Sequence, residues 1–169
     1  KVAFRKIDIG LDLISSRMGQ AKKTGVYDKL SAYDGEKFPL RSESMGTVIS
    51  NCVLEHVENL EKVVGEMARV IKPGGKIIVS VMAKPWEENL LGALVLGNTY
   101  KSWMRKKQIH VNLLTVNQWV DLFERNGLSK RGEIGYLSPA ACRLIDLSHY
   151  LSIPNLISYK LFGKWVMWP

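Results

Sequence analysis

Two aspartates and two histidines are the side chains of this sequence best placed for chemistry. Asp12 ends a predicted strand over residues 6–11. A carboxylate at that edge of a strand can accept hydrogen bonds from both hydroxyls of a ribose, but it can also cap the helix expected next. Asp34 precedes a glycine, and Asp-Gly ahead of a proline is ordinary turn chemistry. The residues alone leave a binding role and a structural role open for each aspartate.

His56 and His110 are the candidates for proton transfer, because an imidazole with an unperturbed pKa near ~6.5 exchanges a proton readily at neutral pH. An isolated histidine is more often a structural group, so this alternative stays open for both. The 3 histidines and 2 cysteines show no zinc-ligand spacing, and we expect no metal site. Two cysteines are also too few for a disulfide scaffold, which favours a reducing cytoplasm.

A strand–helix–strand unit between Met45 and Val81 is expected to position such residues. Residues 47–50 are apolar and β-branched, as in a strand buried on both faces. Pro73-Gly74-Gly75 is expected to stop the following helix, and a second β-rich run starts at Lys76. The unit predicts a crossover between two parallel strands. The helix carries an apolar stripe at three- and four-residue steps, formed by Leu60, Val63, Val64, Met67, Val70 and Ile71.

Two motifs in this unit resemble the class I S-adenosylmethionine-dependent methyltransferases. The segment 50–57, SNCVLEHV, and the segment 66–75, EMARVIKPGG, are similar to the "LEH" loop and the "E-x-x-R-V-L-K-P-G-G" helix end of the type 11-like group. Each motif alone is weak, but the two occur in order and at this separation. The resemblance implies an α/β fold, a Rossmann-like and mostly parallel sheet with flanking helices, and S-adenosylmethionine as the cofactor.

The resemblance assigns roles to residues at two predicted strand ends. Asp12 matches the acidic residue that binds the cofactor's ribose, with Leu13 beside it. Asp34 and Gly35 match a "D-A-x-x-L-P-F" segment, in which the aspartate accepts a hydrogen bond from the adenine amino group and the next backbone N–H faces a ring nitrogen. Glycine in place of alanine keeps that backbone donor.

The resemblance also places the reacting end of the site. Asn51 and Cys52 match a loop whose backbone touches the methionine end of the cofactor, and His56 in the same loop could be a polar group of the pocket. His110 lies in an insertion that usually folds over the active site in this group, which makes it the first candidate for accepting a substrate proton. Anchoring of the loop is an equally good role for His110.

Composition and charge limit the partners. The 169 residues are 46% hydrophobic and 24% charged, as in one ordinary globular domain. No apolar run approaches the ~20 residues needed to span a bilayer, and no leader pattern is seen. The net charge of +8 is spread over small basic groups. A solvated basic face is the first interpretation, attraction to anionic substrates or a membrane surface the second, and RNA the third.

The expected domain organisation is a Rossmann-like core over residues 1–137, with an insertion at about 84–115, followed by a helical, aromatic segment over 138–169. A capping box at Thr115 and a sixth strand at about 129–136 are also expected. The last segment could cap the substrate site, pack on the core or lie on a membrane surface.

One element of the family's pattern is absent from the sequence. The glycine-rich "D-x-G-x-G" turn after the first strand does not occur. If Asp12 ends the second strand, that turn and strand would lie before residue 1. The expected function is in-line methyl transfer to a small-molecule, lipid-like or glycan acceptor. A non-catalytic methyltransferase-like binding subunit, an RNA methyltransferase and a nicotinamide-dependent Rossmann enzyme are the alternatives.

Overall fold

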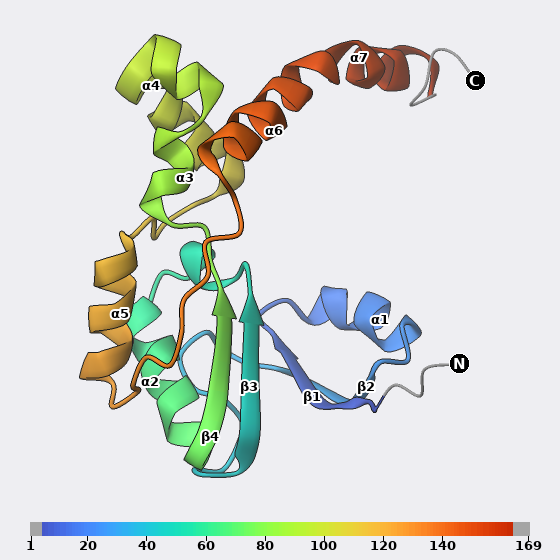
Figure 1. Cartoon of the computed structure of the whole chain (residues 1–169). Coiled ribbons are helices and arrows are strands. Elements are labelled where there is room, and N and C mark those ends of the chain that lie inside the picture. The colour runs from blue at the N-terminus through green and yellow to red at the C-terminus, as the bar shows by residue number, and fades with distance from the viewer. Residues whose placement is uncertain (1–4, 164–169) are drawn as a thin grey trace. The chain divides into compact units, whose positions relative to one another are not determined.

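The computed structural model describes residues 5–163 and divides into two compact units (Figure 1). Unit 1 comprises Lys1–Val81 and Val120–Ser129, and unit 2 comprises Met82–Trp119 and Lys130–Pro169. The predicted domain boundary at residue 137 stays a prediction, because compactness in space does not establish which segments fold independently.

Unit 1 contains two pairs of parallel strands and the helices that follow them. The elements in chain order are β1 (Ile7–Asp12), α1 (Ser15–Lys23), β2 (Tyr27–Ala32), β3 (Met45–Asn51), a short 3-10 helix (Leu54–His56), α2 (Leu60–Val70) and β4 (Ile71–Ser80). β1 pairs with β2 and β3 pairs with β4, each in parallel register, with Asp12 opposite Ala32 and Asn51 opposite Ser80. The predicted parallel crossover is confirmed, and the described elements have the expected α/β architecture.

The apolar stripe of α2 forms the core of unit 1, as predicted. The stripe residues from Leu60 to Val70 are buried, and Val64 and Val70 are almost completely enclosed. The stripe ends one residue earlier than predicted, because Ile71 is the first residue of β4 rather than the last of the helix. Pro73 disfavours the helical conformation at Lys72, the residue before it, so the helix has to end at or before this position.

The prediction that residues 47–50 are buried on both faces is wrong for the described structure. Val48 and Ser50 are half-buried, but Ile49 is 66% exposed and its partner across the register, Ile78, is 56% exposed. Successive side chains of a strand point to opposite faces. One face of the β3–β4 pair is therefore left open by the described residues.

Unit 2 is helical and has a core of its own. It contains α3 (Lys84–Glu88), α4 (Leu91–Gln108), α6 (Pro139–Leu151) and α7 (Ile153–Phe162), and α5 (Val116–Arg125) begins in unit 2 and ends in unit 1. α4 is interrupted at Gly97, whose φ of 55° lies in the left-handed region. Among the described residues, no helix is both long enough and apolar enough to cross a membrane. The core consists of Leu90, Ala93, Tyr100 and Met104, with Trp86 against it.

Two sequence predictions around α5 have different outcomes. The capping box is confirmed, because the Gln118 N–H donates to Thr115 Oγ1 at 3.3 Å and the Thr115 N–H donates to Gln118 Oε1 at 2.9 Å. The strand expected at 129–136 does not form, and these residues have no regular structure. Two glycines and three charged residues interrupt this segment, and its apolar side chains Ile134 and Tyr136 are 87% and 57% exposed.

Candidate cofactor-binding site

Asp12 lies at the carboxyl end of β1 and organises the turn that follows it. Its Oδ1 accepts a hydrogen bond from the Ile14 N–H at 2.8 Å, and its backbone oxygen accepts one from the Tyr33 N–H at 3.2 Å. α1 has Ile14 as its N-cap residue and no side-chain cap, so Asp12 shapes the turn before the helix rather than capping it. An ionised carboxylate has about four acceptor positions, which leaves capacity for donors from a ligand.

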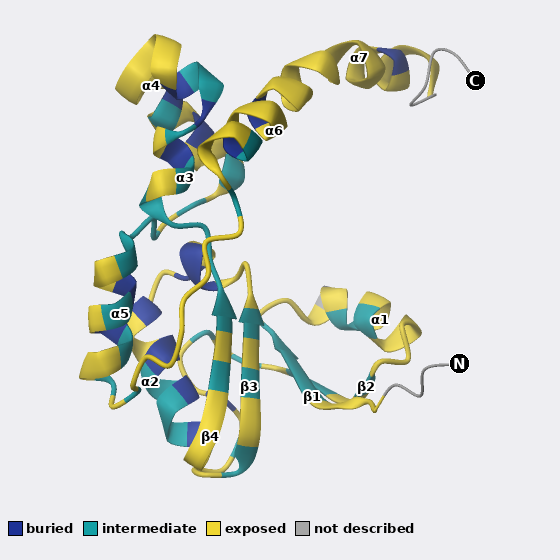
Figure 2. Cartoon of the chain, viewed as in Figure 1, coloured by how far each residue is buried: buried dark blue, intermediate teal, exposed yellow. Residues whose placement is uncertain are grey.

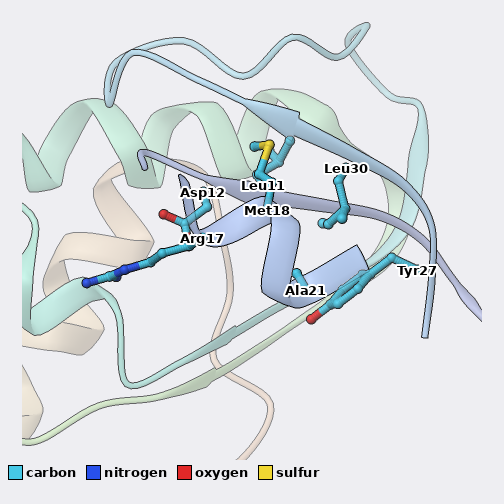
Figure 3. A pocket seen from close by; sticks show the side chains of 8 residues that line it. Leu11, Asp12, Arg17, Met18, Ala21, Tyr27 and Leu30 are labelled. Atoms are coloured by element: carbon cyan, nitrogen blue, oxygen red, sulfur yellow. The ribbon is translucent and has the colours of Figure 1, made fainter. Parts of the chain in front are cut away.

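A small hollow lies beside Asp12, among β1, α1 and β2 (Figure 3). Its volume of about 80 Å³ has room for a few water molecules rather than for a nucleoside. A side chain at Gly10 would meet Tyr27 and Leu30 at 2.9 Å, so the wall of the hollow is tightly packed there. The hollow is a packing gap beneath α1, with Asp12 and Arg17 among its lining residues.

Asp34 holds a tight loop after β2. Its Oδ1 accepts hydrogen bonds from the Lys37 N–H at 2.8 Å and the Glu36 N–H at 2.9 Å, and these two donors hold the pKa of the Asp34 carboxyl below its ordinary value. Gly35 has a φ of 87°, and a Cβ at this position would lie 3.0 Å from Leu13 Cδ2. The left-handed backbone therefore favours glycine, and a side chain at this position would also require Leu13 to shift slightly.

Four of the predicted cofactor residues consequently meet at one place. Asp12 and Leu13 follow β1, and Asp34 and Gly35 follow β2, which is the strand parallel to it. The Tyr33–Asp12 hydrogen bond and the Leu13–Gly35 approach join the two loops. In open α/β sheets the carboxyl ends of the strands form the ligand-binding edge.

Asn51 and Cys52 lie at the carboxyl end of the other strand pair. Cys52 has a φ of 50°, its N–H donates to Ser80 O at 2.8 Å, and its Sγ lies 3.7 Å from Ser80 Oγ. Both residues are exposed at the end of β3. The left-handed backbone at Cys52 turns the chain away from the strand and into the "LEH" segment.

The two candidate histidines belong to different units. His56 ends the 3-10 helix of unit 1 and is exposed. His110 belongs to unit 2, where its N–H donates to Arg105 O at 2.9 Å and its ring packs edge-on against Trp86 at 5.2 Å between ring centroids. This geometry suits a loop anchor, the second role that the sequence left open. Proton transfer by His56 or His110 stays a prediction.

Sequence reasoning missed two residues that position the Asp34 loop. Glu66 and Arg69 belong to the 66–75 motif, and both reach Phe38: Glu66 Oε2 accepts the Phe38 N–H at 2.7 Å, and Arg69 Nη2 donates to Phe38 O at 3.2 Å. Arg69 Nη1 also donates to Leu40 O at 2.9 Å. Hydrogen bonding from Arg69 holds the pKa of the Glu66 carboxyl below its ordinary value. The opposite charges of Glu66 and Arg69 at a spacing of three residues indicate an ion pair on the helix. Nothing in the sequence indicates that this pair binds the backbone of Phe38.

Comparisons with known proteins identify the family that the chain resembles. A family described as a methyltransferase domain matches residues 4–79. An uncharacterized protein of Methanocaldococcus jannaschii, MJ1123, is 30% identical over 121 residues, which are 72% of this chain and 55% of that protein. The sterol 4-C-methyltransferase strm-1 of Caenorhabditis elegans is 38% identical over 56 residues, 33% of this chain and 17% of that enzyme.

A solved structure is similar in fold. The S-adenosylmethionine-dependent methyltransferase of Thermotoga maritima superposes with a TM-score of 0.58 at 22% identity, over 73% of this chain and 56% of that one. At this identity the similarity concerns the fold. The chain spans about half the length of the M. jannaschii relative and of the T. maritima structure.

Proposed function

Because this chain belongs to the class I S-adenosylmethionine-dependent methyltransferases, we propose that it binds that cofactor at the ends of β1, β2 and β3 and serves methyl transfer. The observation that carries the proposal is the meeting of Asp12, Leu13, Asp34 and Gly35 at one edge. The pair Asp12 and Leu13 is separated from the pair Asp34 and Gly35 by more than 20 positions in the sequence.

The residues present fit the adenosine part of the cofactor. Asp12 offers a carboxylate at a strand end, where it can accept hydrogen bonds from the two ribose hydroxyls. Gly35 leaves open the space that a Cβ would fill next to Leu13, so a flat adenine ring can approach the backbone closely. Asp34 stays ionised at neutral pH, since its pKa is below the ordinary value, and can accept from the adenine amino group.

The protein's part in the reaction is positioning. S-adenosylmethionine supplies a methyl group that its sulfonium already activates. Asn51 and Cys52 at the end of β3 are proposed to hold the methionine end in line with the acceptor, where proximity and alignment provide most of the rate. His110 and His56 are the proposed proton acceptors for substrates that lose a proton on methylation.

The acceptor is proposed to be a small molecule or a lipid-like molecule. The partial similarity to a sterol 4-C-methyltransferase supports the lipid-like class, although it covers only 33% of this chain.

Nuclear magnetic resonance can test the location of the site. We expect S-adenosylhomocysteine, titrated into the labelled chain, to shift the backbone amide signals of Leu13 and Gly35 while the signals of the exposed α1 residues Gly19 and Lys22 stay in place. Shifts at α1 without shifts at Leu13 and Gly35 would contradict the assignment of the site, and an unchanged spectrum would contradict cofactor binding by the chain.

A further inference from the structure

α6 exposes a stripe of leucines on the side opposite to its packed face. Cys142 and Asp146 are buried, with 3% and 1% exposed surface. Leu144 and Leu151 point to the opposite side of the helix from Cys142 and are 66% and 70% exposed. Leu147, which lies between the two leucines in the sequence, is 39% exposed. Spacing of three and seven residues places all three leucines on one side of the helix.

Hydrogen bonds within unit 2 fix which side of α6 faces outward. Tyr100 Oη of α4 donates to Asp146 Oδ1 at 2.5 Å, and the Gly92 N–H donates to Asp146 Oδ2 at 2.9 Å. Tyr150 Oη donates to Tyr100 Oη at 2.6 Å. The carboxylate of Asp146 is thus held against α4 by two donors, and the leucine stripe is directed away from α4.

α7 continues the exposed apolar surface, and Figure 2 shows both helices as mostly exposed. Every leucine, isoleucine, tyrosine and phenylalanine of α6 and α7 is at least 38% exposed. Contiguous patches of this kind on a protein mark a surface that is covered by a partner or a membrane. In α7 the exposed apolar side chains are Ile153, Leu156, Ile157, Tyr159, Leu161 and Phe162.

The charges around this surface are cationic. Residues 138–163 contain one acidic residue, Asp146, which is buried, whereas Arg143 and Lys160 are exposed. Unit 2 has 10 lysines and arginines against 4 aspartates and glutamates, so it carries +6 of the chain's net charge of +8. An exposed apolar surface with cations and no exposed carboxylate complements an anionic lipid surface.

We propose that α6 and α7 lie on the surface of an anionic lipid bilayer, with the leucine stripe of α6 and the apolar side chains of α7 inserted between headgroups. No described helix is long and apolar enough to span the bilayer, so the helices rest in the interface plane. A second copy of the chain fits less well, because two such surfaces would bring like charges together. RNA fits less well too, since two exposed cations among so many apolar side chains form no phosphate-binding stripe.

Vesicle flotation tests this inference and requires no methyl acceptor. We expect the chain to float with vesicles of phosphatidylglycerol and phosphatidylcholine, to bind pure phosphatidylcholine at least about tenfold more weakly, and to be released by high salt. The double variant Leu144→Glu/Leu151→Glu should lose vesicle binding by about tenfold or more. Its matched control is Val95→Glu/Ile134→Glu, which places the same charges at side chains of unit 2 that are 77% and 87% exposed and should bind as the parent does.

Three results would overturn the inference. The parent chain could fail to bind anionic vesicles, or the α6 variant could bind as tightly as its control. Light scattering could also show a parent dimer that the α6 variant converts to a monomer without any vesicle binding, which would assign the surface to a second copy. Matching circular dichroism spectra of the two variants establish that both are folded.

Discussion

Arg69 and Glu66 form a two-pronged ion pair on α2, in which Arg69 Nε donates to Glu66 Oε1 at 2.6 Å and Nη2 donates to Oε2 at 2.7 Å. The same two side chains hold both the N–H and the carbonyl of Phe38. Phe38 is buried and its ring packs edge-on against Tyr33, the residue before Asp34. The helix that ends in the "R-V-I-K-P-G-G" motif therefore fixes the loop that is proposed to receive the adenine.

The first prediction concerns the loss of this clamp. Arg69→Met should lower the free energy of unfolding by about 2–3 kcal/mol, because it leaves a part-buried carboxylate and two backbone carbonyls without their charged donor. The control is Arg125→Met, which removes an exposed ion pair with Glu61 at 3.3 Å and should cost less than about 1 kcal/mol. Urea unfolding of both variants gives the comparison, and equal losses would show that Arg69 holds nothing in place.

The second prediction follows from the pKa of Glu66. Its folded-state pKa is lowered, chiefly by the hydrogen bond from Arg69, so its contribution to stability is complete above the ordinary value of 4.5 and is lost as the pH falls through the lower folded-state pKa. Glu66→Gln should therefore lose less stability than the parent between pH 7 and pH 3, while Glu61→Gln should behave as the parent does. Urea unfolding at both pH values measures this, and parallel curves for parent and Glu66→Gln would contradict it.

The third prediction separates backbone strain from ligand approach. Gly35 and Gly25 both have left-handed backbones, with φ of 87° and 67°, but a Cβ meets Leu13 only at Gly35. Gly35→Ala and Gly25→Ala should each cost about 1 kcal/mol of stability. Only Gly35→Ala should also weaken binding of S-adenosylhomocysteine, by about tenfold. If Gly25→Ala weakened binding equally, the effect would belong to folding and not to the site.

The fourth prediction concerns the polar anchor of unit 2. Asp146→Ala should lower the free energy of unfolding by about 2–3 kcal/mol, because it removes the carboxylate that accepts from the buried Tyr100 hydroxyl and from the part-buried Gly92 N–H. Burial and the hydrogen bond to Asp146 raise the pKa of Tyr100, so its phenol stays protonated as this donor at physiological pH. The exposed Asp121→Ala is the control. Unfolding by denaturant distinguishes the two, and a mutant Asp146→Ala as stable as its control would rule out the anchor.

The elements that sequence predicted well are those with strong local signals. These signals depend on residues that are close in the sequence. They are the period of the α2 stripe, the capping pair of Thr115 and Gln118, and the β-branched runs of β3 and β4. Asp12 lies at the end of β1 and Asp34 just after the end of β2, and their role in cofactor binding stays a prediction.

The failures came from contacts that are distant in sequence. Arg69 reaches Phe38 and Leu40 across about thirty residues, and a single sequence gives no indication of that pairing. The β-branched run that contains Ile49 predicted a strand buried on both faces, but Ile49 is exposed. Burial depends on which element covers the sheet, and the strand's own residues do not specify that element. The segment 129–136 has the residues of a weak strand, but without pairing in the described structure it stays irregular.

Calorimetric titration with S-adenosylhomocysteine tests the central claim most directly. The account predicts that the chain binds this ligand and that Asp12→Ala weakens binding by at least about tenfold, since one carboxylate is proposed to hold both ribose hydroxyls. Asp8→Ala is the matched control, because Asp8 is an exposed aspartate of the same strand, and it should bind as the parent does. Equal affinity of the Asp12→Ala and Asp8→Ala variants would contradict the ribose assignment, and no binding by the parent would contradict the proposed function of this chain.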